Sequence, residues 1–295
     1  MIFLNYQHLR YFQAVALEGS IARASEKLNL GPPAISIQIK QLEDQLGHAL
    51  FERRNRKLVL TQAGQVTLEY ANQIFSLGDE LKEVLQAGSF ARKVRLEIGV
   101  LESIPKTVIQ HLTDAARSWE SCTVTVLEGT GDFLFRELLS HRIDLAISDY
   151  QPDVGDTRRF VIRSLGRHPL SVFGTQKYKG LSKNFPESLQ GQPFLLPTLH
   201  SKRRHDLDHF FRINQLNVSV VMETQDTSVQ KLMAVRDMGL VALPDFAGLP
   251  LVQQKIFLNL GTLEGVYEEI FLVSSPRTIA NPVADFLMKD FNLEF

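Results

Sequence analysis

A dense group of cations lies near the amino terminus of the chain. Arg53, Arg54, Arg56 and Lys57 occupy four of five consecutive positions, and apolar residues flank the group on both sides. This pattern predicts two short strands joined by a basic turn. Such a turn can place cations on phosphates or in a narrow minor groove, whereas most charge runs are simply solvated turns. The neighbouring sequence decides between these two interpretations.

The residues before the basic turn have the spacing of three short helices. The third begins at Pro32, where a missing backbone N–H costs nothing, and Ile35, Ile39 and Leu42 form its apolar face. A helix of this size fits the major groove of DNA, with its N-terminal side chains facing the base edges. If this part of the chain binds DNA, its candidate contacts are Pro32, Ser36, Ile37, Gln38, Lys40, Arg53, Arg54, Arg56 and Lys57.

The charge of the whole chain hides this local excess. Over 295 residues, 32 Lys and Arg against 33 Asp and Glu give a net charge of −1, which excludes a uniformly basic nucleic-acid coat. Residues 1–60 hold eight Lys and Arg against five Asp and Glu, so this part carries +3 and the remainder −4. A small anion-binding head on a slightly acidic body has this division of charge.

A long helix is expected directly after the basic turn, with Thr61 as its N-cap. Apolar side chains recur along it at steps of three and four, the spacing that keeps one seam facing a partner helix. The seam residues are Tyr70, Ile74, Leu77, Leu81 and Val84. The seam either joins two copies of the chain or docks onto the core of the preceding helices, and its sustained spacing favours a dimer.

Beyond Arg92 strands and helices alternate, which is typical of an α/β fold with a mostly parallel sheet. A second unit of the same texture begins near Leu165, and a last strand (269–273) and closing helix (282–291) complete one or other unit. Two such lobes imply a cleft between them. Loops at the carboxyl ends of strands usually bind small ligands in a cleft of this kind.

The same sequence bounds the cellular setting. No stretch is long and apolar enough for a membrane span, and Met1 to Arg10 lack the pattern of a secretory signal. A single cysteine, Cys122, allows no internal disulfide, which fits a reducing compartment. We therefore expect a cytoplasmic protein with no membrane partner.

Several short motifs follow one another near the amino terminus: the run from His8 to Ser20, Pro33-Ala-Ile-Ser36, Leu46-Gly47 and Leu60-Thr-Gln-Ala-Gly64. Together they resemble the LysR-type transcriptional regulators. The resemblance implies an α/β protein with an all-α-type head: a winged helix-turn-helix (1–60), a linker and dimerisation helix (61–92) and a two-lobed effector-binding domain (93–295) like the periplasmic binding proteins. Lobe 1 would cover about 93–164 and 267–295, and lobe 2 about 165–266. The implied partners are double-stranded operator DNA, further copies in a homodimer or homotetramer, and RNA polymerase for an activator.

A narrower resemblance concerns Asn5-Tyr6-Gln7-His8-Leu9, Ile147-Ser-Asp149 and Leu195-Leu-Pro197. These segments look like the branch that contains the sodium/proton antiporter activator, which implies control of such an antiporter gene. The alternative is a LysR-type regulator of another regulon that responds to a small organic metabolite. A two-lobed α/β enzyme is a third alternative, but the chain has no G-x-S-x-G elbow, P-loop or dinucleotide fingerprint, so we expect no enzyme.

The third helix departs from the pattern of the resembled family at two places. Gly31-Pro32 replaces the usual Ser/Thr-Gln, and Ile37 stands where Arg or another polar residue is common. Ile37 can pack against a thymine methyl group but cannot hydrogen-bond to a base. We therefore expect fewer direct hydrogen bonds to bases and more dependence on DNA shape and phosphate contacts.

In the resembled family the inducer lies between the lobes, at the loops that follow the strands. Carried over by position, the candidate effector contacts are Glu102, Ser103, Thr130, Asp149, Thr198, His200, Ser201, Asp226 and Thr227. Three carboxylates in one lining favour a cation such as Na+, and a small molecule is the alternative effector. Ser103 and Ser201 have a second interpretation, as helix caps.

Histidines near residue 205 are the remaining candidates for chemistry. His205 and His209 are one helical turn apart and have the spacing of a shared metal. Lys202, Arg203 and Arg204 oppose a cation there, and no third ligand stands at fixed spacing. We expect no metal and interpret the segment as the polar face of a helix.

Overall fold

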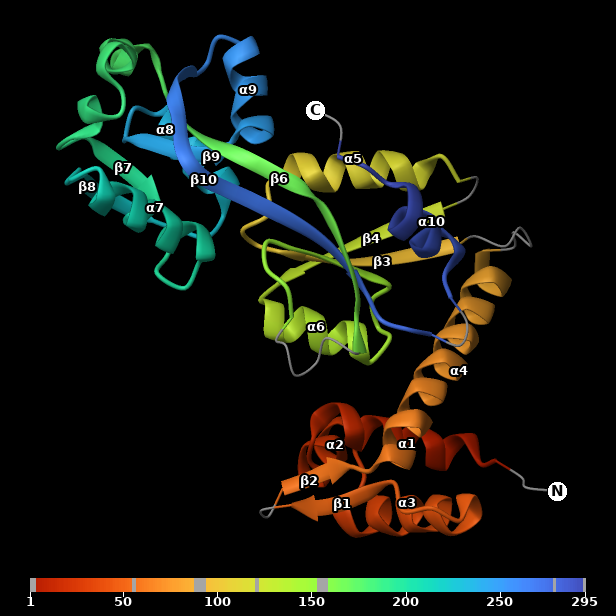
Figure 1. Cartoon of the computed structure of the whole chain (residues 1–295). Coiled ribbons are helices and arrows are strands. Elements are labelled where there is room, and N and C mark those ends of the chain that lie inside the picture. The colour runs from red at the N-terminus through yellow and green to blue at the C-terminus, as the bar shows by residue number, and fades with distance from the viewer. Residues whose placement is uncertain are drawn as a thin grey trace. The chain divides into compact units, whose positions relative to one another are not determined.

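The structure is a computed structural model that describes residues 4–54, 57–87, 94–119, 122–152, 159–277 and 280–293. The chain divides into two compact units, one of residues 1–92 with 140–142 and one of residues 93–139 with 143–295. Figure 1 shows the helices and strands of both units.

The first unit consists of three short helices, a two-stranded hairpin and one long helix (Figure 1). Its elements are α1 (Tyr6–Glu18), α2 (Ile21–Leu28), α3 (Pro32–Leu46), β1 (Phe51–Arg54), β2 (Lys57–Leu60) and α4 (Gln62–Ala87). The hairpin strands pair antiparallel, and the hydroxyl of Thr61 accepts a hydrogen bond from the Gly64 N–H at 3.0 Å. The predicted N-cap of the long helix is therefore confirmed.

Residues in the left-handed backbone conformation end the three short helices. Gly19 follows α1 at φ 64°, Asn29 follows α2 at φ 52° and Gly47 follows α3 at φ 72°. Glycine and asparagine adopt this conformation at lower steric cost than other residues. Pro32 occupies the first position of α3, as predicted, because its fixed φ suits a helix start.

An apolar core joins the helices to the hairpin. Phe12 and Leu42 are fully buried, and the Phe12 ring lies 5.2 Å from the ring of Phe51 on β1. Glu43 adds a polar link, because its Oε1 accepts a hydrogen bond from the Leu50 N–H at 2.7 Å. The hairpin is thereby held beside α3 by both packing and hydrogen bonding.

The second unit is built on one eight-stranded sheet in the order β4-β3-β5-β10-β6-β9-β7-β8. The strands are β3 (Val94–Leu101), β4 (Cys122–Gly129), β5 (Leu145–Ser148), β6 (Val161–Gly174), β7 (Pro193–Leu196), β8 (Ser219–Glu223), β9 (Leu240–Pro244) and β10 (Leu258–Ser274). The helices are α5 (Lys106–Arg117), α6 (Gly131–Leu139), α7 (Lys202–Ile213), α8 (Thr227–Val235), α9 (Asp245–Gln253) and α10 (Pro282–Asp290), with 3-10 helices η2 (Gln176–Asn184) and η3 (Glu187–Leu189).

Two long strands carry the chain between two lobes. β6 and β10 pair antiparallel along their length, and Figure 1 shows a lobe at each end of the pair. β10 joins β5 through Phe271 opposite Ser148, and β6 joins β9 through Leu170 opposite Pro244. β3, β4 and β5 therefore form the first lobe, and β7, β8 and β9 the second. The predicted fold class, a winged helix-turn-helix with a long helix and a two-lobed α/β domain, is confirmed.

The sequence did not predict the full length of β6 and β10. Only one end of β6 is continuously buried. Toward its other end the apolar pattern, from which a strand is predicted, is interrupted by Arg163, Arg167 and His168. In β10 the pairing register shifts between Asn259 and Gly261 and again further along, which breaks the alternation of buried and exposed residues. Among the described residues, no helix is both long and apolar enough to cross a membrane.

Gly64 in the first turn of α4 provides a test of this packing. A Cβ atom there would lie 2.0 Å from the backbone oxygen of Leu50, so the backbone would have to shift. We predict that Gly64→Ala lowers the free energy of unfolding of the first unit by about 2 kcal/mol. Urea unfolding followed by circular dichroism measures the change.

Gly78 in the same helix is the matched control. No atom lies within 4 Å of a Cβ built at Gly78, so Gly78→Ala should raise stability by up to about 1 kcal/mol through helix propensity alone. Stabilisation of similar size in both variants would contradict the close approach of Leu50 to α4.

Candidate nucleic-acid interface and ligand site

The outer face of α3 carries the side chains predicted to contact DNA. Pro32, Ser36, Ile37 and Lys40 are exposed, Gln38 is half-buried, and the apolar residues of the other face are buried. The helical period therefore separates the two faces as the sequence predicts. Ile37 is 56% exposed, which places a large apolar side chain at the centre of this surface.

Two polar residues on this face are only weakly engaged by their own helix. The Ser36 hydroxyl donates to the Pro32 carbonyl at 3.0 Å and keeps its lone pairs for an outside donor. The Lys40 Nζ lies 3.2 Å from a carboxylate oxygen of Asp44, and both side chains are mostly exposed. A surface ion pair of this kind is weak, so Lys40 is available to a phosphate.

The hairpin lies beside α3 as the predicted wing. Arg53 on β1 is exposed, and a pocket of about 260 Å³ between α3 and the hairpin is lined in part by Ser36, Lys40 and Arg53. α3 and the hairpin thus share one surface. Arg56 lies outside the described residues, as do the side chains of Arg54 and Lys57.

α4 divides the predicted dimerisation residues into two groups. Ile74 is half-buried and packs against the core of the first unit, which was the alternative stated for the whole seam. Large apolar side chains that are 48% to 61% exposed follow one face of the helix: Val66, Tyr70, Leu77, Leu81 and Leu85. Sequence reasoning missed Val66 and Leu85, and the side chain of Val84 lies outside the described residues.

In the first lobe, the predicted effector contacts follow the carboxyl ends of three neighbouring strands. Glu102 and Ser103 follow β3, Thr130 follows β4 and Asp149 follows β5. Ser103 and Asp149 are buried, whereas Glu102 and Thr130 are exposed. The cap proposed for Ser103 is wrong, because α5 begins at Lys106 with Pro105 at its N-cap position.

In the second lobe, the predicted contacts follow β7 and β8. Ser201 is buried at the N-cap position of α7, His200 is exposed, and Thr227 opens α8 with no exposed surface. The two loops are joined, since Gln225 Nε2 donates to the Thr198 hydroxyl at 3.0 Å.

The three acids proposed as a cation lining have separate roles. Asp226 caps α8, because its Oδ1 accepts hydrogen bonds from Ser228 N at 2.7 Å and from Val229 N. Glu102 is exposed and Asp149 is buried. Within the described part of the chain, no group of three His, Cys, Asp or Glu side chains is arranged to hold a metal ion. The positions of these acids therefore do not assemble a carboxylate site for a cation.

A buried ion pair, which the sequence did not predict, lies in the second unit between α7 and β10. Arg203 Nη1 donates to Glu268 Oε2 at 3.1 Å, and both side chains are only 3% exposed. Burial raises the pKa of Glu268 to about 7, with Arg203 lowering it and the nearby Asp149 raising it. Asp149 follows β5 of the first lobe and Arg203 lies on α7 of the second lobe. A charged group from each lobe therefore shifts the pKa of Glu268.

Several polar atoms in the same region are buried with no hydrogen-bond partner among the described residues. They are Ser201 Oγ, Arg203 Nε and Nη2, Thr227 Oγ1, Gln230 Oε1 and Glu268 Oε1. Buried polar atoms are normally paired because an unpaired one costs free energy. No local pattern in the sequence marks Arg203 and Glu268 as partners, because they lie 65 residues apart.

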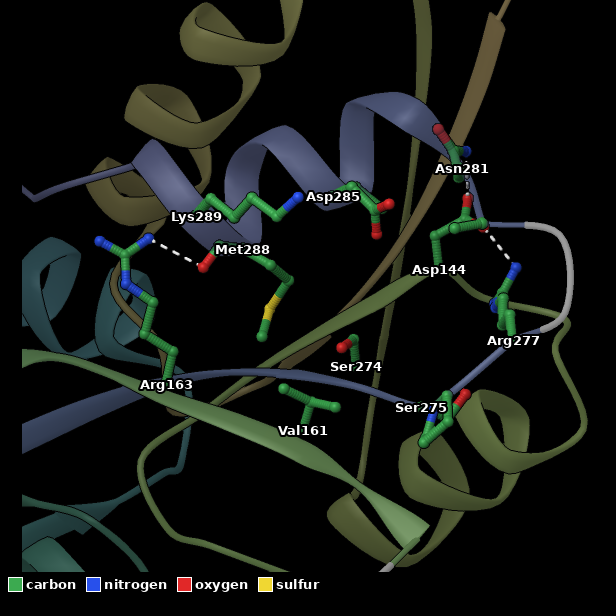
Figure 2. Close-up of a pocket in the computed structure, with 13 residues that line it drawn as sticks. Asp144, Val161, Arg163, Ser274, Ser275, Arg277, Asn281, Asp285, Met288 and Lys289 are labelled. Carbon is green, nitrogen blue, oxygen red and sulfur yellow. Dashed lines mark hydrogen bonds and ion pairs between the residues drawn. The ribbon is translucent and has the colours of Figure 1, made fainter.

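The second unit also has a pocket of about 430 Å³ that is separate from the predicted effector contacts. Figure 2 shows that it lies between α10 and the β6 and β10 strands. Asp144 accepts hydrogen bonds from Arg277 and Asn281 at 2.6 and 3.0 Å, and Arg163 donates to the carbonyls of Leu287 and Met288, both at 3.1 Å. These hydrogen bonds attach α10 to the sheet. The main charged groups of this pocket, Asp144, Arg163 and Arg277, therefore stabilise the fold.

Comparisons with known proteins agree over both units. Residues 6–65 match the family of bacterial regulatory helix-turn-helix proteins, lysR family, and residues 92–289 match the LysR substrate binding domain. The chain is 27% identical over 285 residues to the transcriptional activator protein NhaR of Escherichia coli K12, covering 96% of this chain and 93% of NhaR.

Solved structures extend the similarity to the fold of the whole chain. ArgP of Mycobacterium tuberculosis gives a TM-score of 0.62 at 17% identity, covering 98% of this chain and 99% of ArgP. DarR of Vibrio fischeri in complex with DNA gives a TM-score of 0.57 at 16% identity, covering 98% of this chain and 100% of DarR.

The raised pKa of Glu268 makes stability depend on pH. Its ordinary value is 4.5 and its value in the folded protein is about 7, so the folded state binds the proton more tightly. The stabilisation is complete below pH 4.5 and is lost as the pH rises through about 7. We predict that, relative to Glu268→Gln, the free energy of unfolding of the wild type falls by about 3 kcal/mol over this range.

Urea unfolding curves at a series of pH values measure this difference. Glu264→Gln, at an exposed position of β10, is the matched control and should follow the wild-type dependence. A constant difference between the wild type and Glu268→Gln across the range would show that Glu268 does not titrate there.

Proposed function

Because the chain belongs to the LysR family and is a transcriptional regulator with a DNA-binding helix-turn-helix and an effector-binding domain, we propose that α3 and the β1–β2 hairpin together bind operator DNA. A small ligand at the junction of the two lobes changes operator affinity. The observation that carries the DNA part is the exposed surface that α3 shares with the hairpin. The similarity to the activator NhaR along almost the whole chain supports an activating output.

The side chains of this surface divide the work of recognition. Lys40 and Arg53 supply cations to phosphates, which gives affinity that falls with salt. Ile37 offers only an apolar surface, so its natural partner in the major groove is a thymine methyl group. Ser36 accepts a hydrogen bond from a base or water. This division makes shape and methyl contacts more important than bidentate hydrogen bonds to bases.

The proposed DNA-binding form is a homodimer. The exposed apolar stripe on α4 would be costly in a monomer, and a second copy can cover it with the same stripe. Dimeric helix-turn-helix proteins bind two half-sites whose spacing follows the symmetry of the protein. A homotetramer would need a second interface.

The ligand site that we propose comprises the loops after β3, β4, β5, β7 and β8, where the predicted effector contacts lie. A ligand alters operator affinity only if it binds differently to the DNA-bound and free forms. Contacts from both lobes meet this condition, because their relative position can differ between the two forms.

Footprinting tests the proposed function directly. The full-length protein is incubated with the DNA upstream of its own coding sequence, with and without sodium chloride and small metabolites. We expect a protected region with two half-sites. No protection under any condition would contradict the proposal.

Two variants separate the proposed contacts on this operator. Arg53→Ala should reduce the slope of log affinity against log salt by about two, because each protomer of the dimer loses one phosphate contact. Ile37→Ala should leave that slope unchanged and weaken binding about fivefold, because an apolar contact is lost. Titrations at several salt concentrations measure both quantities.

Operators with deoxyuridine in place of thymine provide the control for Ile37. Removing the contacted methyl group should weaken the wild type and leave Ile37→Ala unaffected. Equal weakening of both proteins would remove Ile37 from the base contacts, and an unchanged slope for Arg53→Ala would remove Arg53 from the phosphate contacts.

The dimer rests on the exposed stripe of α4. We predict that Leu77→Glu converts the dimer to a monomer, because it places two carboxylates in an apolar seam. Light scattering after size-exclusion chromatography measures the mass. Ser76→Glu adds the same charge at an exposed neighbouring position and should remain dimeric. A Leu77→Glu protein that stays dimeric would place the interface elsewhere.

A further inference from the structure

Two consecutive arginines at the start of α7, Arg203 and Arg204, are both buried but differ in their hydrogen bonding. Arg204 is fully engaged on one side: its Nε lies 2.9 Å from Asp208 Oδ2, and its Nη1 donates to the Pro197 carbonyl at 2.8 Å and to Glu223. These bonds hold α7 against the ends of β7 and β8. The role of Arg204 is thus accounted for by the fold.

Arg203 is equally buried, but among the described residues it makes a single hydrogen bond, to Glu268. Its Nε and Nη2 have no partner in the described structure. These two N–H groups point in the same direction and form the side-on fork of the guanidinium, which matches the two oxygens of a carboxylate. The unpaired atoms of Arg203 are therefore those that bind a carboxylate in bidentate fashion.

The amino-terminal end of α7 adds to this preference. Ser201 occupies the N-cap position without a side-chain capping bond, and its hydroxyl is buried and unpaired within the described residues. Side chains on a helix lean toward its N-terminus, so Arg203 in the first turn extends toward the same end as the free N–H groups of α7. The N-terminus of this twelve-residue helix also favours an anion, because it carries the positive end of the helix dipole.

Glu268 and Asp149 impose a second requirement on a ligand. Glu268 Oε1 is buried and finds no donor among the described residues, and Asp149 is close enough to Glu268 to act on its charge. A simple anion would pair with Arg203 but would leave Glu268 Oε1 without a donor. A bare cation would face the positive charge of Arg203. A ligand that carries both charges satisfies both sides.

We propose that the junction of the two lobes binds a small zwitterion of the α-amino-acid type. Its carboxylate lies on the side-on fork of Arg203 and the N-terminus of α7, and its ammonium group donates to Glu268 Oε1. The inference rests on the proposed function in placing the effector at this junction, and it specifies the chemical class that the site accepts.

Thermal unfolding of the full-length protein with each proteinogenic α-amino acid at millimolar concentration tests the proposal. At least one amino acid should raise Tm by about 2 °C or more. Its deaminated acid and its decarboxylated amine should both fail. No shift with any amino acid, or an equal shift with either analogue, would overturn the proposal. Sodium chloride against potassium chloride is the cation arm, and a shift with sodium alone would overturn it in favour of a cation.

Variants then assign the two charges by calorimetric titration with the active amino acid. Arg203→Lys keeps the positive charge but removes the fork, so affinity should fall about tenfold or more. Glu268→Gln should abolish the preference for the amino acid over its deaminated acid. The double variant Arg203→Met, Glu268→Gln removes both charges together, which keeps the buried site neutral, and should also lose binding.

Arg212→Lys and Glu264→Gln make the same substitutions at exposed positions of α7 and β10, and should bind like the wild type. Wild-type affinity in Arg203→Lys would contradict the assignment of the fork. Because these titrations contain no DNA, the two proposals fail separately. A protein that binds the amino acid but protects no DNA contradicts only the proposed function, and the reverse result contradicts only this inference.

Discussion

The pairing of β6 with β10 is the constraint on which the second unit depends. Both strands run through the two lobes, so every other element is attached to one end or the other of this pair. The pairing is not uniform. Its register shifts on both sides of the segment from Tyr267 to Glu269, and Pro169, opposite Tyr267, supplies no N–H to the ladder. The least regular part of the pair therefore carries Glu268, the residue on which charged groups of both lobes act.

In the first unit the constraint is at Leu50, whose backbone N–H and carbonyl both have close partners. Its N–H donates to Glu43, its carbonyl accepts from the Thr61 N–H at 3.0 Å, and Gly64 packs against that carbonyl with no room for a side chain. These interactions fix the hairpin beside α3 without using the outer face of α3. Residues that build the head are thus distinct from those available to DNA, so Ile37 can differ from the family pattern without disturbing the fold.

Local pattern was sufficient where one element decides the outcome. The period of α3 separated Ile35 and Ile39 from Ser36 and Ile37, and the alternation of strands and helices indicated the two lobes. Pattern was insufficient where partners are distant in the chain. Ile74 keeps the spacing of its exposed neighbours on α4, yet it packs on the head because that part of the helix crosses the core.

The ligand site shows the same limit more sharply. Asp226 counted as a potential cation ligand in the sequence, but its carboxylate is used to cap α8. In the sequence Arg203 is one of several polar-face cations, but in the structure it is buried in an ion pair with Glu268, which makes it the centre of the proposed site. The chemistry of an ionisable side chain is set by its partners and its solvation, and neither is encoded in the spacing of nearby residues.

The difference between Arg203 and Arg204 also bears on regulation. A buried ion pair contributes little net stability when its remaining polar atoms are unpaired. The pair of Arg203 and Glu268 therefore adds little to the stability of the fold. The same unpaired atoms favour ligand binding, because a ligand that hydrogen-bonds to them removes the free-energy cost of burying them without a partner. Asp149, Glu268 and Arg203 come from the first lobe, the connecting strand and the second lobe, respectively. A ligand that binds Arg203 and Glu268 beside Asp149 has an affinity that depends on lobe spacing, and this dependence is what linkage between a ligand and DNA requires.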